Sequence, residues 1–283
     1  MCEFCHKHGE GKTWYLRAEN YSEDLLSDLR RRGFIEEFFK NLPENYTSNV
    51  KQLAQLEKLP GFVKRAVRGR ISNRMKASHF GQVVPIEDVE KIFEFITSIV
   101  RLPCVCRHIT VGHEHRYCYG VSLAPDGGEM ARIIRGIDAA YLTGPDTAGL
   151  EPLTKEQALA AFRDHEKHGL CHTVWTFRAP YIGGVCNCDR TDCLGLKMQL
   201  RARIPILFRA EYAAAVDPDL CTGCRECLRL CPFGALSYSP ARSKVSIDDK
   251  LCFGCGICRS ACPQGALSLF ERSAVPATRN LWV

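Results

Sequence analysis

Two runs of cysteine near the C-terminal end offer eight thiols at one repeated spacing. The first run is Cys221, Cys224, Cys227 and Cys231, followed by Pro232. The second run, 31 residues later, is Cys252, Cys255, Cys258 and Cys262, followed by Pro263. Two-residue gaps let a tight loop present three soft thiolates to neighbouring irons, and proline then fixes φ after the fourth. The spacing predicts iron–sulfur ligation. Structural zinc is the weaker alternative, because zinc sites usually separate two C-x2-C pairs by a longer loop.

The stretch from about 208 to 272 resembles the two-cluster bacterial ferredoxin domain at every ligand position. In that family three cysteines of each run hold one [4Fe–4S] cluster and the fourth ligates the other cluster. The resemblance implies one cluster on Cys221, Cys224, Cys227 and Cys262 and another on Cys252, Cys255, Cys258 and Cys231. It also implies a pseudo-twofold α+β fold and the transfer of single electrons at low potential.

Short segments of alternating apolar and polar residues flank both runs and predict four strands. They are 212–216, 234–239, 244–247 and 265–270. We expect these strands to form two hairpins. Gly223, Gly254 and Gly256 lie between the cysteines, where backbone N–H groups must approach the cluster sulfides closely.

Nine further cysteines precede these runs, and most of them are clustered. They are Cys2, Cys5, Cys104, Cys106, Cys118, Cys171, Cys186, Cys188 and Cys193. Cys104-Val-Cys106 and Cys186-Asn-Cys188 each follow an apolar segment, where the chain would leave an element and enter a loop. A C-x-C pair in extended chain directs both thiols to one face, which suits chelation.

Three segments around these cysteines are similar to those of a group of anaerobic multi-cluster iron–sulfur proteins. They are Leu102-Pro-Cys-Val-Cys-Arg107, Gly169-Leu-Cys-His172 and Val185-Cys-Asn-Cys188. In that group a cysteine-containing domain precedes a two-cluster ferredoxin domain. The resemblance implies a third [4Fe–4S] cluster, with candidate ligands Cys104, Cys106, Cys118, Cys186, Cys188 and Cys193. A zinc site and free thiols are the alternatives for these residues.

The remaining upstream cysteines allow weaker interpretations. Cys171 is next to His172, and we interpret it as ordinary apolar packing. Cys2 and Cys5, with His6 and His8 beside them, form a C-x2-C half-site for a fourth cluster or for zinc. A redox-active thiol pair or a frayed tail would account for the same residues.

Histidines fall in two groups. His108, His113 and His115 lie between the two C-x-C segments, where they are either further ligands or solvated loop residues. His165, His168 and His172 flank the end of a predicted helix, where the helix dipole favours a cation, and we assign them a structural role.

The elements that must position the upstream cysteines are both helical and extended. Ser22 caps a helix that continues to Lys40 and stops before Pro43, and a turn at 125–128 joins two strands within 119–142. Further helices are predicted at about 50–57, 87–100 and 154–167. A basic segment over 64–76 is either a solvated helix face or a docking surface for an acidic partner.

These patterns predict an α+β protein with two domains and a tail. The domains are a mixed cysteine-containing domain over 1–200 and a two-cluster domain over 208–272, followed by a tail over 273–283. The boundary lies at about 194–209, which is basic and then apolar.

Composition narrows the class of protein. Hydrophobic residues make up 46% of the 283 residues and charged residues 25%, as in folded soluble proteins. No apolar run is long enough to span a bilayer, and the N-terminus has no signal pattern. Seventeen cysteines without an export signal favour reduced thiols that hold metal, hence a cytoplasmic protein of an anaerobic or micro-aerobic cell. The formal charge of +6 falls to about +2 with two clusters of charge −2, so it does not indicate nucleic-acid binding.

No phosphate loop, dinucleotide fingerprint or H-E-x-x-H motif is present, so flavin and nicotinamide have no recognisable site. The leading hypothesis is a subunit that relays single electrons between a low-potential donor and a catalytic partner. The alternative is a reductase that binds substrate at an open iron of the upstream cluster. A DNA-binding regulator acting through residues 64–76 is the weakest of the three.

Overall fold

The computed structural model describes residues 13–56, 58–112, 115–144, 147–274, 276–278 and 281. Cys2, Cys5, His6 and His8 lie outside the described residues, and so does His113. The structure is therefore silent on the predicted N-terminal half-site. Helices and strands are both abundant, which confirms the α+β fold class.

A seven-stranded sheet organises the upstream part of the chain, in the order β4-β2-β3-β6-β5-β1-β7. The strands are β1 (Gly81–Val84), β2 (Ser98–Leu102), β3 (Cys118–Ser122), β4 (Glu151–Leu153), β5 (Cys171–Thr176), β6 (Ile182–Cys188) and β7 (Leu207–Phe208). Only β1 and β7 pair in parallel; the other neighbours are antiparallel. The sequence around β7, at the predicted domain boundary, thus completes the upstream sheet.

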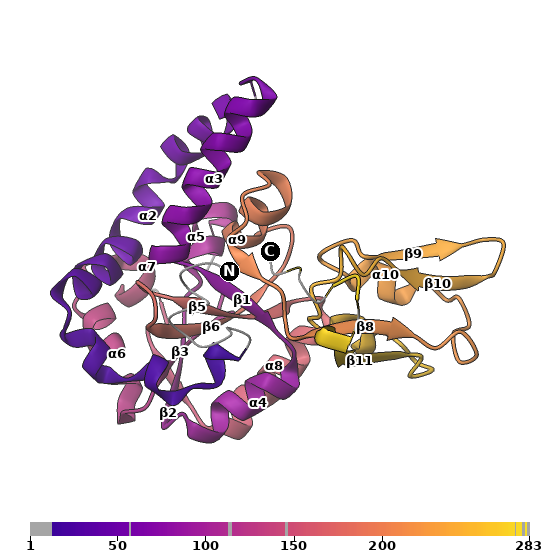
Figure 1. Ribbon diagram of the computed structural model, residues 1–283. Helices are drawn as coiled ribbons and strands as arrows, with labels where there is room; N and C mark the ends of the chain where they lie inside the picture. The colour runs from indigo at the N-terminus through magenta and orange to yellow at the C-terminus, as the bar shows by residue number, and fades with distance from the viewer. Residues whose placement is uncertain are drawn as a thin grey trace.

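Helices cover both faces of this sheet (Figure 1). One face packs against α4 (Ile86–Phe95) and α8 (Lys155–Lys167), whose Phe93 and Phe162 share a core with Val174 and Val185 of the sheet. The other face carries α5 (Val105–Val111), α6 (Gly128–Arg135) and, beyond them, α2 (Leu29–Leu56) and α3 (Gly61–Ser78). Short helical segments complete this part: η1 (Trp14–Leu16), η2 (Ala18–Tyr21), η3 (Glu23–Ser27), η4 (Pro125–Gly127), α7 (Ala140–Thr143), α9 (Leu194–Leu196) and η5 (Lys197–Arg201).

The first long helix differs from the prediction at both ends. Ser22 does accept a hydrogen bond from the Asp24 N–H, but it caps the 3-10 turn η3, and α2 begins only at Leu29. Pro43 does not stop α2, which continues to Leu56 and absorbs the predicted helix at 50–57. Proline removes the N–H that would bond the carbonyl four residues earlier. That carbonyl, Phe39, instead accepts a 2.7 Å hydrogen bond from the Tyr141 hydroxyl.

Two further local predictions were wrong, because apolar spacing does not separate a buried strand from a helix. The predicted helix over 87–100 ends at Phe95, and Ser98–Leu102 forms strand β2, between β4 and β3. After the turn at Pro125, the chain enters α6 and not a second strand. In contrast, the capping box of α8 is confirmed: Thr154 and Gln157 exchange hydrogen bonds of 3.2 and 2.9 Å.

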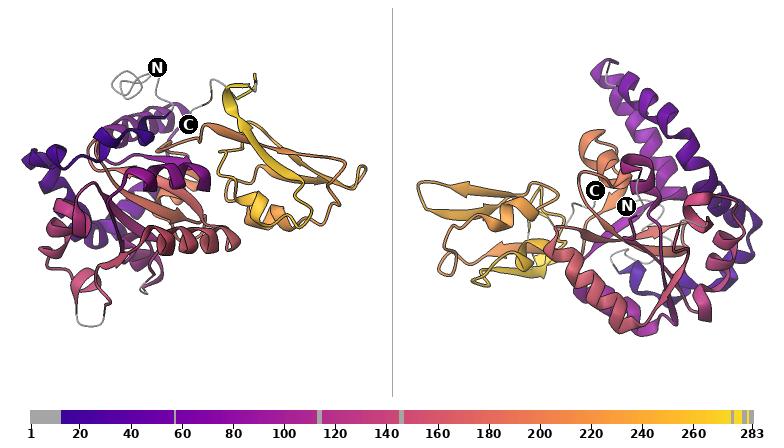
Figure 2. Two further views of the ribbon diagram at one scale, coloured as in Figure 1. Left: turned by 90° about the horizontal axis from the view of Figure 1, so that it is seen from below. Right: turned by 180° about the vertical axis from the view of Figure 1, so that it is seen from behind.

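The C-terminal unit contains four strands and two short helices. They are β8 (Tyr212–Val216), α10 (Glu226–Leu230), β9 (Leu236–Ser239), β10 (Lys244–Ile247), α11 (Ile257–Ser260) and β11 (Leu267–Glu271), followed by η6 (Arg272–Ala274). The four predicted strands are present, but only β9 and β10 form a hairpin, whereas β8 pairs with β11 from the far end of the unit. The unit projects from one side of the sheet domain (Figure 2).

Backbone conformation repeats within this unit at the 31-residue period of the cysteines. Positive φ occurs at equivalent positions of the two halves. The three pairs are Gly223 and Gly254, Arg225 and Gly256, and Gly234 and Gly265. A Cβ on Gly223 would lie 2.3 Å from the Ser243 carbonyl oxygen, and one on Gly254 would lie 1.9 Å from that of Tyr212. The two halves thus repeat the same local backbone conformation at these positions, in step with the repeated motif.

Two glycine substitutions separate backbone strain from close packing. We expect Gly265→Ala, whose Cβ would meet nothing within 4 Å at φ +61°, to cost only about 1–2 kcal/mol. Gly254→Ala combines φ +71° with the clash against Tyr212, so we expect it to cost more than about 4 kcal/mol and to deplete iron from the second run. Thermal unfolding and iron analysis of both variants measure the difference. Equal behaviour of the two would contradict the close approach at Gly254.

The C-terminal unit is joined to the sheet domain by specific contacts. Arg259 of α11 forms a bidentate ion pair with Glu87 of α4, at 2.6 and 2.9 Å. The Ser260 hydroxyl donates a 3.1 Å hydrogen bond to the Glu166 carbonyl of α8. The second cysteine run therefore faces the sheet domain. No helix among the residues that the structure describes is long and apolar enough to cross a membrane.

Candidate metal centres

The C-terminal unit brings the eight cysteines together in two groups of four. One small cavity is lined by Cys221, Cys224 and Cys227 of the first run and by Cys262 of the second. The other is lined by Cys252, Cys255 and Cys258 of the second run and by Cys231 of the first. We call these the Cys221 site and the Cys252 site. Each group has the crossed composition that the resemblance implies, with a fourth thiol from the other run.

Local backbone geometry suits thiolates at these positions. The Ala235 N–H donates to the Cys231 sulfur at 3.4 Å, and the Ala266 N–H donates to the Cys262 sulfur at 3.3 Å. Each donor lies four residues after its cysteine, beyond the proline that prevents a regular helix. Thiols grouped in fours with N–H donors aimed at sulfur fit a [4Fe–4S] centre, whose bridging and ligating sulfurs accept such bonds.

The two sites have different surroundings although their spacing is the same. Thr222 and Gln264 line the Cys221 site, and Cys224 is exposed. At the Cys252 site the equivalent positions are Phe253 and Phe233, whose rings stack 4.1 Å apart. The guanidinium carbon of Arg209 lies 4.2 Å from the centre of the Phe253 ring, and Arg209 donates a 2.7 Å hydrogen bond to the Cys252 carbonyl. The Cys252 site is thus apolar and shielded from water, whereas the Cys221 site borders solvent.

All six candidate ligands of the upstream cluster line one cavity of about 160 Å³ beside the sheet. We call them the upstream thiols: Cys104, Cys106, Cys118, Cys186, Cys188 and Cys193. Apart from these thiols the cavity wall is mainly apolar and includes Phe39, Met130 and Trp175. Segments far apart in sequence therefore converge here, as the sequence predicts.

Contacts among the upstream thiols run as a continuous chain. The Cys186 thiol lies 3.4 Å from the Cys118 sulfur. Hydrogen bonds from Cys106 and Cys118 lower the pKa of Cys104 well below the ordinary value. Hydrogen bonds from Cys106 and Cys188 likewise lower the pKa of Cys193 well below the ordinary value. The thiols line one common space, and soft thiolates of this kind suit iron–sulfur clusters and zinc alike.

Strand alternation explains why these thiols share a face. Side chains of successive strand residues point to opposite faces. Val185 of β6 belongs to the core beneath α4 and α8, so Cys186 and Cys188 point to the other face. Cys118 is the register partner of Cys186, and Cys171 is the register partner of Cys188. Cys171 therefore lies on the same face as the upstream thiols, which the sequence did not indicate.

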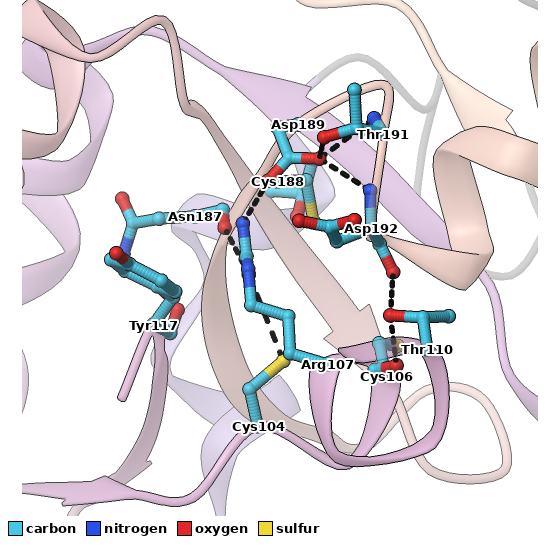
Figure 3. Close-up of polar contacts among 11 residues, drawn as sticks. Cys104, Cys106, Arg107, Thr110, Tyr117, Asn187, Cys188, Asp189, Thr191 and Asp192 are labelled. Carbon is cyan, nitrogen blue, oxygen red and sulfur yellow. Dashed lines mark hydrogen bonds and ion pairs between the residues drawn. The ribbon is translucent and has the colours of Figure 1, made fainter. Parts of the chain in front are cut away.

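Arg107 is the central polar residue of the upstream site (Figure 3). Its side chain is buried, with 3% exposed, and it forms an ion pair with Asp189. The guanidinium also donates to the Asn187 carbonyl at 3.3 Å and to the Cys104 sulfur at 3.8 Å, and it lies 4.1 Å from the centre of the Tyr117 ring. A buried cation in this position offsets the negative charge of thiolates.

The turn before Cys193 is held by Asp189 (Figure 3). Its carboxylate accepts hydrogen bonds from the backbone N–H groups of Thr191 and Asp192, at 2.8 and 2.6 Å. Burial opposes the ionised form, but these N–H groups and Arg107 nevertheless lower the pKa of Asp189. The Thr110 hydroxyl lies 2.9 Å from the Cys106 carbonyl oxygen and 3.1 Å from that of Asp192. The loop that carries Cys193 is thereby fixed against α5.

Replacing Arg107 tests this arrangement. We expect Arg107→Gln to cost about 3–5 kcal/mol, because it leaves the carboxylate of Asp189 without its buried cation. It should also lower the reduction potential of an upstream centre, by an amount on the order of tens of millivolts, because one nearby positive charge is lost. Thermal unfolding and potentiometric titration measure the two effects. Arg163→Gln is the matched control, because Arg163 forms an exposed ion pair with Glu90. Equal effects of both variants would argue against the role given to Arg107.

None of the described histidines singled out in the sequence lines the cavity of the upstream thiols, whereas His79, which was not singled out, does. His115 stacks on Tyr117, with ring centres 5.7 Å apart, and His108 stacks on Tyr141. His165 is not the predicted cation at a helix end: burial and the neighbouring His172 lower its pKa to about 4, and its Nε2 lies 2.9 Å from the Tyr119 hydroxyl. Of His165, His168 and His172, only His168, which is exposed, caps the C-terminal end of α8.

Comparison with known proteins bears on the C-terminal unit. Residues 220–266 match the family model of the 4Fe-4S dicluster domain, and this stretch contains both cysteine runs. The match shows a ferredoxin-type domain there and supports [4Fe–4S] clusters and iron–sulfur electron transfer as the general function. A search of curated proteins found no match to the chain.

Sequence reasoning missed the polar residues around the thiols. Arg107 closes the segment Leu102–Arg107 and Asp189 follows Cys188, so both lie within or beside the motifs already singled out. Arg209 lies in the boundary segment and has no sequence signal that ties it to the Cys252 site. Only the folded chain brings these residues to the sulfurs.

Proposed function

We propose that this protein is an electron-transfer subunit that relays single electrons between a low-potential donor and a catalytic partner, in the cytoplasm of an anaerobic or micro-aerobic cell. The observation that carries the proposal is the grouping of fourteen thiols at three places in one molecule: four at the Cys221 site, four at the Cys252 site and six upstream. A [4Fe–4S] centre, when bound, accepts and releases one electron without a change of ligands.

The chain's own residues supply what each centre needs. Cysteine thiolates hold iron, and backbone N–H groups such as those of Ala235 and Ala266 stabilise negative charge on sulfur. Phe233 and Phe253 exclude water from the Cys252 site. Arg107 places a positive charge beside the upstream thiols. We therefore propose three [4Fe–4S] clusters, on the two C-terminal sites and on the upstream thiols.

Reduction and complex formation test the proposal. Anaerobically purified protein, titrated with dithionite, should accept about three electrons per chain, one for each centre. Gel filtration with candidate redox enzymes should then identify a partner that binds the reduced protein and receives electrons from it. Centres that stay oxidised under strong reductants at low potential would contradict the proposal.

One observation favours a second candidate, a reductase in its own right. The wall of the cavity that the upstream thiols line is otherwise mainly apolar, with Phe39, Met130 and Trp175 among its residues. If one upstream iron lacks a thiolate, a small uncharged substrate could reach it. Candidate substrates should then alter the electron paramagnetic resonance signal of the upstream centre. An upstream cluster ligated by four thiolates and indifferent to added ligands would exclude this function.

A further inference from the structure

Cys171 connects the upstream thiols to the C-terminal unit. It begins β5, where it is the register partner of Cys188, and its side chain is fully buried. It belongs to a large apolar cluster that contains Cys188 and Cys193 of the upstream thiols and cysteines of both C-terminal sites. Its burial agrees with the apolar packing expected from the sequence, and its register adds that it lies beside the upstream thiols.

Backbone contacts support this placement. A Cβ on Gly169, two residues before Cys171, would lie 3.4 Å from the carbonyl oxygen of Leu230, the residue just before Cys231. Cys171 itself is fully buried and pairs in register with Cys188, so this contact lies beside the upstream thiols.

Exposure distinguishes the two C-terminal sites. The four cysteines of the Cys252 site are nearly inaccessible, with 7–8% of each exposed, whereas Cys224 of the Cys221 site is exposed. The ion pair between Arg259 and Glu87 holds the second run against the sheet domain. The Cys221 site lies on the side of the unit that borders solvent.

We infer that the three sites form a single-file electron route: the Cys221 site is the surface port, the Cys252 site is the intermediate, and Cys171 lies at the contact between that intermediate and the upstream thiols. This inference rests on the proposed function and specifies which C-terminal site exchanges electrons with the upstream centre. In the inner step the cysteines of the Cys252 site would hold the cluster that gives up one electron, and the upstream thiols would hold the centre that takes it up. No bond breaks and no proton moves. An external donor therefore docks near Cys224.

Magnetic coupling between reduced centres tests the order of the sites, since it falls steeply with distance. Two double variants are compared: Cys224→Ser with Cys227→Ser, which removes the Cys221 site, and Cys255→Ser with Cys258→Ser, which removes the Cys252 site. We expect the fully reduced first variant to keep a coupled signal between its two remaining centres. The second variant should show two independent signals. Coupling in the second variant, or its absence in the first, would overturn the inference.

Cys171 is tested separately. Cys171→Ala should leave iron content unchanged, because Cys171 is not a proposed ligand, and should slow electron arrival at the upstream centre several-fold in rapid-freeze experiments. Cys171→Ser, which keeps the shape of the side chain, should be closer to wild type. Unchanged arrival rates in both variants would remove Cys171 from the route.

Measurements on wild-type protein decide the order of the sites if a variant fails to fold. If a serine variant fails to fold, wild-type protein poised at successive potentials answers the same question, because coupling appears only when two adjacent centres both hold an electron. If wild-type protein contains no third iron–sulfur centre, the part of the proposed function that places a cluster on the upstream thiols is wrong. A third centre coupled to the Cys221 site would refute only the order inferred here.

Discussion

Cys106→Ser combined with Cys193→Ser should lower the iron content from about twelve to about eight per chain, the loss of one four-iron centre. Cys106 contacts both Cys104 and Cys193, so this pair removes the middle of the thiol chain. The two C-terminal sites draw on other elements and should keep their signals. Iron and sulfide analysis of anaerobically purified protein, read beside electron paramagnetic resonance spectra, measures the effect.

Cys171→Ser is the matched control for this double variant. It removes a buried thiol on the same face of the sheet, beside Cys188, but outside the contact chain of the upstream thiols. Its iron content should remain at about twelve per chain. If the double variant also keeps twelve, Cys106 and Cys193 are not ligands of the third cluster, and the four remaining upstream thiols are its candidate ligands. A loss in the control as well would mean that any disturbance of this face releases iron.

Paired substitutions in the C-terminal unit should show that the fourth cysteine of each run serves the other site. We expect Cys231→Ser to lower iron by about four per chain, and Cys252→Ser to do the same. Combining the two should cause no further loss, because both belong to the Cys252 site. Combining Cys231→Ser with Cys221→Ser should remove about eight irons, because Cys221 belongs to the other site.

The opposite pattern would contradict the crossed arrangement. If each run holds its own cluster, Cys231→Ser with Cys221→Ser would remove only about four irons and Cys231→Ser with Cys252→Ser about eight. The comparison uses only cysteine-to-serine changes at buried positions, so general destabilisation affects both combinations alike.

Much of the chemistry could be predicted from the sequence because metal ligands follow strict spacing. The two runs and the paired C-x-C segments contain twelve of the fourteen thiols that the structure groups at a cavity; Cys118 and Cys193 are the other two. Strand and helix boundaries were less predictable. Ile99 continues the helical apolar spacing of Val89, Ile92, Phe93 and Ile96, yet residues 98–102 form strand β2, whose Ile99 and Val100 are buried on opposite faces of the sheet.

Other features depend on contacts that no local pattern contains. Pro43 remains within α2 because Tyr141, about a hundred residues later, bonds the carbonyl that proline leaves free. Cys171 is a cysteine like the upstream thiols, and only the register of β5 against β6 places it beside Cys188. The approach of Leu230 to Gly169 likewise depends on how the C-terminal unit docks.

The most direct test of the account is the content of iron, sulfide and zinc in wild-type protein purified without oxygen. Three cubes predict about twelve irons and about twelve sulfides per chain, a brown colour, and bleaching on reduction. A colourless protein that carries zinc and shows no change with dithionite would contradict the central claim that these thiols hold electron-carrying clusters.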